Sequence, residues 1–139
     1  GLDGRKMSKS YGNTIPLFGT PKQLQKSINK IKTNLLEPGE PKNPEESTVF
    51  QIWSAFATEA ERERMYADFE GGIGWGDAKK QLFELVNGEL SEARERYHEL
   101  MAQPAQVEDV LQAGAERLRP KSKALLEQVR DAVGLRAYA

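Results

Sequence analysis

Apolar residues recur at intervals of three and four along most of this chain, and this spacing restricts its fold more than any other feature. One series runs through Leu24, Ile28, Ile31 and Leu35, and others continue as far as Val133. Such spacing places side chains on one face of an α-helix, whereas a half-buried strand alternates with a period of two. No alternating stretch is longer than a few residues, and no internal repeat is present. The pattern therefore predicts an all-α fold, a helical bundle.

Capping residues and prolines predict where the first helices begin. Thr20 is followed by a proline, a pair typical of a helix start, and Thr58 predicts the start of a further helix that ends near residues 70–72. Residues 37–44 contain three prolines and a glycine and are predicted to form a connector. At its end, Asn43 and the proline after it are expected to cap the next helix.

The second half of the chain predicts longer helices. Residues 72–77 carry three glycines at alternate positions, and we favour a role for them in close packing over an anion site. One long helix is predicted from about residue 77 to residue 101. Pro104 is expected to open the last segment, Pro120 to kink or split it, and Gly134 to end it.

The charge of the chain is unevenly distributed. Residues 1–36 contain seven basic side chains and one acidic side chain, although the net charge of all 139 residues is −1. The basic end suggests a partner that carries phosphate groups. With no cysteine and only His98, the chain offers no disulfide, no thiolate and no His-based metal site. We therefore expect no bound metal. No apolar run reaches the roughly 18 residues of a membrane span, so we expect no membrane partner and take a cytoplasmic protein as the default.

One short loop carries the most specific chemistry, and it lies between two glycines. It consists of Lys6, Met7, Ser8, Lys9 and Ser10. Lysine ammonium groups supply compact positive charge, serine hydroxyls can donate hydrogen bonds, and loop N–H groups can face an anion. Such a loop can close over a triphosphate. The alternative is an ordinary solvated basic loop.

The pentapeptide resembles the signature loop of class I aminoacyl-tRNA synthetases. The stretches 1–15 and 72–79, with the segments 114–117 and 133–135, resemble the bacterial tryptophanyl-tRNA synthetase family in particular. This resemblance covers nearly the whole chain. It implies an enzyme that activates tryptophan with ATP and Mg²⁺, transfers it to tRNA(Trp), and works as a homodimer.

The resemblance also implies roles for single residues and segments. Lys6 and Lys9 would be the catalytic charge carriers, and Met7, Ser8 and Ser10 would contact the nucleotide with them. Residues 1–19 would be a remnant of the catalytic domain, and residues 20–139 would form the helical anticodon-binding domain.

The family's His-containing signature and its Rossmann-type half have no counterpart in this sequence. We therefore expect a C-terminal piece of the enzyme that begins at the signature loop, is monomeric and is inactive alone.

Two further basic clusters are candidates for contact with the tRNA backbone, although such clusters are commonly only solvated helix faces. The first consists of Lys22, Lys26 and Lys30. The second, near the carboxyl end, comprises Arg117, Arg119, Lys121 and Lys123. The four candidate tRNA-binding residues there are Arg117, Arg119, Lys123 and, further on, Arg130. Trp53 and Trp75 are expected to be packing residues rather than platforms for base stacking. Competing hypotheses are a stand-alone helical RNA-binding module and a helical interaction domain.

Overall fold

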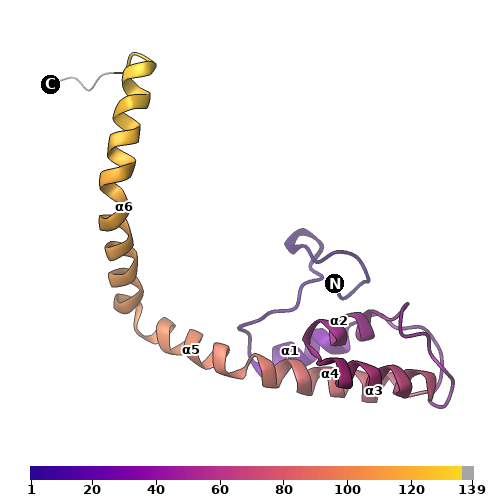
Figure 1. The fold of residues 1–139 in the computed structure, drawn as a ribbon. Coiled ribbons are helices and arrows are strands. Elements are labelled where there is room, and N and C mark those ends of the chain that lie inside the picture. Colours follow the sequence, from indigo (N-terminus) through magenta and orange to yellow (C-terminus); the bar gives the residue numbers. More distant parts are fainter. Residues whose placement is uncertain (136–139) are drawn as a thin grey trace. The chain divides into compact units, whose positions relative to one another are not determined.

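The computed structural model describes residues 1–135 and confirms the all-α prediction, because it contains no strand in that range. After one short 3₁₀ turn, η1 (Lys9–Tyr11), come α1 (Pro21–Asn29), α2 (Thr48–Phe56), α3 (Glu59–Glu70), α4 (Trp75–Glu89), α5 (Ser91–Ala102) and α6 (Pro104–Ala132). The chain divides into two compact units, residues 1–96 and residues 97–139 (Figure 1).

Side-chain caps define the starts of the first helices. Thr20 and Thr58 each accept a hydrogen bond from the N–H three residues on and complete a reciprocal capping box, as their positions predict. The predicted start of α2 was wrong. Ser47, not Asn43, is the N-cap, and its Oγ accepts from Phe50 N at 3.3 Å. The connector therefore extends four residues further than its prolines indicate.

The two predictions for the long helices also need correction. The prediction of a single helix over residues 77–101 was wrong, because α4 ends at Glu89 and α5 begins at Ser91. At this junction the Ser91 hydroxyl donates to Gly88 O at 2.8 Å, a local bond that competes with helix continuation. Pro120 does not split α6, which continues through it to Ala132.

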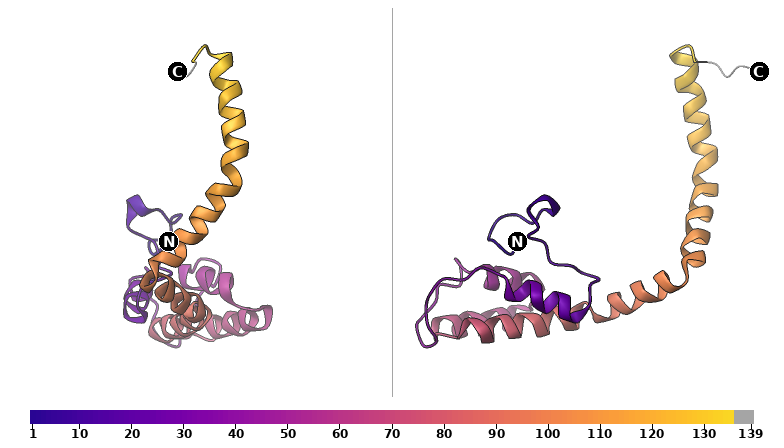
Figure 2. Two further views of the ribbon diagram at one scale, coloured as in Figure 1. Left: turned by 90° about the vertical axis from the view of Figure 1, so that its left-hand side faces the viewer. Right: turned by 180° about the vertical axis from the view of Figure 1, so that it is seen from behind.

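Helices α1 to α4 enclose the core of the first unit, with α4 in contact with both α1 and α2, and α2 in contact with α3 (Figure 2). Phe69 is fully buried and meets the rings of Phe50 and Trp75 edge to face, at centroid distances of 5.6 and 5.7 Å. Of the apolar series that defines α1, the first three residues are buried. Leu35 is 97% exposed, because α1 ends at Asn29 and the helical period no longer applies.

The glycine-rich turn before α4 lies directly against the connector. Gly72 has φ of +87°, and a Cβ at this position would lie 2.5 Å from the carbonyl carbon of Gly39. Gly39 N donates to Gly72 O at 2.8 Å, so the two backbones touch. This contact confirms the predicted packing role for Gly72. Gly76, by contrast, has open space where a Cβ would stand, with no neighbouring atom within 4 Å.

Two side chains of α4 form hydrogen bonds with the end of α1 and the segment that follows it. Lys79 Nζ donates to Asn29 O at 3.1 Å and to Ile31 O at 2.7 Å. Because the last carbonyls of a helix have no N–H partner within it, the ammonium group on Asn29 O serves as a C-terminal cap of α1. Trp75 Nε1 donates to Asn34 Oδ1 at 3.1 Å. Residues 29–34 are thereby held against α4.

The described part of the second unit consists of the end of α5 and all of α6. Pro104 occupies the first turn of α6, and Gly134, with φ of +76°, follows its end, as predicted. Most apolar side chains of α6 are exposed, among them Val110 and Leu111. Among the described helices, none combines the length and the apolar character needed to cross a membrane.

Candidate functional site: a basic N-terminal loop

Residues 1–15, which we call the N-terminal loop, form a closed structure beside the N label in Figure 1. Gly4 and Gly12 flank the Lys-Met-Ser-Lys-Ser segment and have φ of 82° and 61°. Positive φ strains other residues, so both turns favour glycine. The 3₁₀ turn Lys9–Tyr11 ends where Gly12 N donates to Lys9 O at 3.2 Å. The segment therefore has a defined backbone conformation.

Asn13 lies at the centre of this loop and is only 3% exposed. Its Nδ2 donates to Asp3 Oδ1 at 2.7 Å and to Lys6 O at 3.2 Å. Its Oδ1 accepts from Ser8 N at 2.8 Å, and its backbone carbonyl accepts from Leu2 N at 3.0 Å. One residue thus joins the segment before the pentapeptide to the pentapeptide itself.

Asp3 and Arg5 extend this network to the loop surface. Arg5 forms an ion pair with Asp3 at 2.6 Å and lies over the Tyr11 ring at 4.3 Å from its centroid. Hydrogen bonds from the Asn13 amide, and secondarily from Arg5, hold the pKa of the Asp3 carboxyl well below its usual range. Asp3 therefore stays ionised even in acidic solution, where an ordinary aspartate begins to gain a proton, and it remains an acceptor for both partners.

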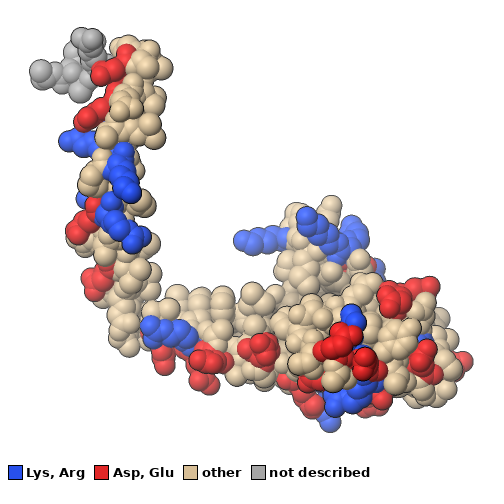
Figure 3. All heavy atoms as spheres, in the orientation of Figure 1, with Lys and Arg blue, Asp and Glu red and all other residues tan. Residues whose placement is uncertain are grey.

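The side chains of the two lysines of the pentapeptide take no part in this network. Lys6 and Lys9 are exposed, and within residues 1–135 neither ammonium group has a hydrogen bond or an ion pair. The hydroxyls of Ser8 and Ser10 lie 2.8 Å apart, and Met7 is 43% exposed. Figure 3 shows Lys and Arg side chains gathered over this loop. The loop therefore presents uncompensated positive charge from a fixed backbone.

Contacts with the first unit set the place of the loop. Leu2 and Ile15 pack against the core at the two ends of the loop. Lys32 N donates to Leu2 O at 2.9 Å, which links the loop to the segment after α1. Because Lys79 holds that same segment, α4 supports the loop through two successive contacts.

The carboxyl-terminal basic cluster lies on α6, and all of its side chains are exposed. At 3.6 residues per turn, Arg119, Lys123 and Arg130 fall within about 40° of one another around the continuous helix. Arg117 lies roughly half a turn away from them. The geometry thus brings three of the four candidate tRNA-binding residues onto one face and leaves Arg117 on another.

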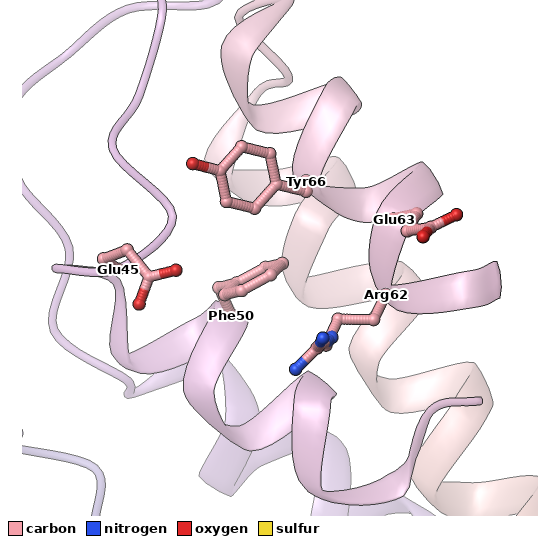
Figure 4. A pocket seen from close by; sticks show the side chains of 5 residues that line it. All are labelled: Glu45, Phe50, Arg62, Glu63 and Tyr66. Carbon is pink, nitrogen blue, oxygen red and sulfur yellow. The ribbon is translucent and has the colours of Figure 1, made fainter. Parts of the chain in front are cut away.

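A shallow pocket of about 170 Å³ lies between α2 and α3 (Figure 4). It is lined by Glu45, Phe50, Arg62, Glu63 and Tyr66. Arg62 is paired with Glu59 at 2.6 Å, so the pocket offers two carboxylates and a guanidinium group that is already neutralised. This charge disfavours a phosphate ligand, and we do not assign the pocket a role in nucleotide binding.

The aromatic residues and the histidine have packing or surface positions. Trp53 is 3% exposed within the core, and Trp75 packs edge to face on Phe69, which confirms the packing interpretation of both tryptophans. His98 is exposed on α5, with its ring 5.5 Å from that of Tyr97. Within residues 1–135, no three His, Asp or Glu side chains are grouped so that they could hold a metal ion.

Comparison with known proteins identifies the family. The family model described as tRNA synthetases class I (W and Y) matches residues 1–91. The chain belongs to this family. It is 57% identical over 136 residues to the tryptophan–tRNA ligase of Neisseria meningitidis serogroup A, a match that covers 98% of this chain and 40% of that protein. It is 49% identical over 138 residues to the tryptophan–tRNA ligase of Pseudomonas putida, a match that covers 99% of this chain and 31% of the relative.

Solved structures agree with the sequence comparison. A crystal structure of tryptophanyl-tRNA synthetase from Campylobacter jejuni, complexed with ADP and tryptophan, matches with a TM-score of 0.91 at 38% identity. The match covers 97% of this chain and 43% of that one. The resemblance predicted from residues 1–15 and 72–79 is confirmed. The chain spans about two fifths or less of the length of the curated relatives named above.

The sequence pattern of the chain indicated the pentapeptide but not the residue that organises it. Asn13 and Asp3 were not among the predicted site residues. A weak signal for Asn13 is its position directly after Gly12, because asparagine side chains often bond nearby backbone in turns. The pairing with Asp3, ten residues earlier, has no local signature.

Proposed function

We propose that this chain acts within a tryptophan–tRNA ligase, where it supplies the loop that binds ATP phosphates and helices that bind tRNA(Trp). The observation that carries the proposal is the pair of exposed, unpaired lysines on a fixed loop within residues 1–135, in a chain 57% identical to a tryptophan–tRNA ligase. A stand-alone RNA-binding or interaction module is not favoured, because the named relatives that match nearly the whole chain are ligases.

The proposed chemistry joins the carboxylate of tryptophan to the α-phosphate of ATP and expels pyrophosphate. Negative charge builds on the leaving phosphates, so Lys6 and Lys9 lower the barrier if they contact the pyrophosphate more strongly in the transition state than in the ground state. Ser8 and Ser10 would donate hydroxyl hydrogen bonds to phosphate oxygens, and Met7 would lie against the adenosine.

Mg²⁺ would enter this reaction as part of the nucleotide substrate. The described residues contain no group of three or more ligating side chains, so they do not fit a protein-held magnesium site. Mg²⁺ commonly keeps several waters and binds through substrate phosphates, which is consistent with delivery as a complex with ATP.

The domain assignment follows from the same proposal. Residues 1–19 would belong functionally with a catalytic nucleotide-binding half, and residues 20–139 would form the helical tRNA-binding part, of which 136–139 lie outside the described residues. The complete ligase would be a cytoplasmic homodimer.

Pyrophosphate exchange provides the test of this function. The 139-residue chain alone is expected to show no exchange above background, because it contributes the loop and not a nucleotide-binding half. A chimera in which the chain replaces the matching 40% of the Neisseria meningitidis ligase is expected to exchange pyrophosphate and to charge tRNA(Trp). The unaltered ligase is the control. A folded chimera without either activity would contradict the proposal.

The basic face of α6 gives a second expected result. Changing Arg119 and Lys123 together to alanine should reduce the slope of log affinity for tRNA(Trp) against log salt by about 1.4–1.8, because each phosphate contact contributes roughly 0.7–0.9. Filter binding by the chimera at several salt concentrations measures this slope. Lys80→Ala, on the exposed surface of α4, is the matched control. An unchanged slope in the double variant would remove α6 from the tRNA interface.

A further inference from the structure

Asn13 is buried to a degree that is unusual for a polar side chain in a surface loop. It is 3% exposed, whereas its neighbours Gly12 and Thr14 are exposed. Both the amide nitrogen and the amide oxygen of Asn13 have partners. A buried amide that is fully hydrogen-bonded specifies one arrangement of its partners, because any other leaves it unsatisfied.

The partners of Asn13 include the backbone atoms that set the course of the pentapeptide. Nδ2 bonds the carbonyl of Lys6, and Oδ1 bonds the N–H of Ser8. These two groups lie on either side of Met7 in the chain. The main chain of the pentapeptide therefore bends at Met7 around the Asn13 amide. Lys6 precedes this bend, and Lys9 follows it at the start of the 3₁₀ turn.

A further bond of Nδ2 ties this bend to a fixed point. Asp3 accepts from Asn13 at 2.7 Å and is itself paired with Arg5. The adjacent residue, Leu2, packs against the core and accepts a hydrogen bond from Lys32. A continuous path of contacts therefore runs from the segment after α1 through Leu2 and Asp3 to the Asn13 amide and the backbone of the lysines.

We infer that Asn13 is the positioning residue of the pentapeptide, and that its amide sets the backbone from which Lys6 and Lys9 reach the phosphates. The catalytic part of this inference rests on the proposed function, while the conformational part does not. The Asn13 amide bonds main-chain atoms of the pentapeptide, so it acts on the lysines through the backbone. Misplacement of catalytic groups by about 1 Å can cost on the order of 100-fold in rate.

Two substitutions separate this role from simple filling of space. Asn13→Ala removes every hydrogen bond of the side chain. Asn13→Asp keeps the shape and the acceptor for Ser8, but it removes the donors and places a second carboxylate beside Asp3. Thr14→Ala, at the next and exposed position, is the matched control.

The first measurement uses the 139-residue chain and needs no activity. Hydrogen exchange of the Ser8 amide, followed by NMR, is expected to become at least about tenfold faster in Asn13→Ala and unchanged in Thr14→Ala. Exchange of core amides in α4 should stay the same. An unchanged Ser8 amide in Asn13→Ala would overturn the inference.

The second measurement uses the Neisseria chimera. Asn13→Asp is expected to lower kcat for pyrophosphate exchange by about 10- to 100-fold, with the KM for tryptophan within about twofold of the parent. Adding Asp3→Asn to Asn13→Asp restores a bond of reversed polarity, because the new amide at position 3 can donate to the new carboxylate. The double variant should therefore recover at least about threefold in kcat.

The outcomes distinguish this inference from the proposed function. If the parent chimera is active and Asn13→Asp leaves kcat unchanged, the inference is wrong. Absence of rescue together with a proportional loss of folded protein would indicate a purely structural role and would also overturn it. If the parent chimera is inactive, the proposed function fails, and Ser8 exchange alone then decides whether Asn13 sets the loop.

Discussion

Changing Lys6 and Lys9 together to methionine is expected to lower kcat for pyrophosphate exchange by at least about 1000-fold in the chimera. Removal of a single charge-assisted contact to the transition state typically costs about 2–4 kcal/mol, or roughly 30- to 1000-fold. Methionine keeps much of the length of lysine and lacks the charge. The loss should therefore report on electrostatics rather than on the volume of the side chain.

The structure makes this a demanding test, because the two ammonium groups have no other described role. Both are exposed, and within residues 1–135 neither forms a bond that would be lost on substitution. The free energy of unfolding of the double variant should therefore stay within about 0.5 kcal/mol of the parent, as for most surface changes. A large fall in rate without a change in stability is the expected combination.

Single-turnover and steady-state exchange assays measure the effect, with Lys22→Met and Lys26→Met on the exposed face of α1 as the matched control. That control keeps the same change in net charge. Without tRNA in the assay, it should leave kcat unaltered. If kcat of the Lys6 and Lys9 variant stayed within about threefold of the parent, the assignment of both lysines to the leaving phosphates would fail.

Local signals explain why part of this structure was predictable from the sequence. The capping boxes of Thr20 and Thr58 involve residues three apart, and the positive φ at Gly12 is a property of one residue. The exposed pentapeptide was recognisable because its chemistry depends on residue types in one short run. Each of these features depends only on residues within a few positions of one another in the chain.

Contacts between distant segments explain the rest. Asn13 acts on Asp3 across ten residues, and Lys79 caps a helix that ends fifty residues earlier, so neither role has a local pattern. Leu35 continues the apolar period of α1 but follows its end, where tertiary contacts and not periodicity decide burial. Pro120 was expected to kink or split α6, and the helix is not split but continues through it.

The glycine-rich stretch before α4 combines both kinds of information. Its three glycines are obvious in the sequence, but only the structure distinguishes them. Gly72 touches the Gly39 backbone and has positive φ, whereas Gly76 lies in the first turn of α4 with open space around it. Gly72 thereby permits the close approach of the connector that carries Lys42, whose Nζ binds the carbonyls of Glu37 and Glu40.

Gly72→Ala is expected to destabilise the chain by about 2–5 kcal/mol. A left-handed backbone costs an alanine roughly 1–2 kcal/mol, and the new methyl group must push the connector backbone away, at a cost like that of overpacking a core. Thermal unfolding followed by circular dichroism should show a fall in Tm of at least about 7 °C.

Gly76→Ala makes the same chemical change four residues later and should be neutral or stabilising by up to about 1 kcal/mol, because alanine favours the helix and meets no neighbour. The difference between the two variants isolates the positive φ of Gly72 and its contact with Gly39 from the general effect of adding a methyl group. Equal stabilities for the two variants would mean that the connector does not depend on close approach at Gly72. In that case the similarity of residues 72–79 to the family would need an explanation other than packing.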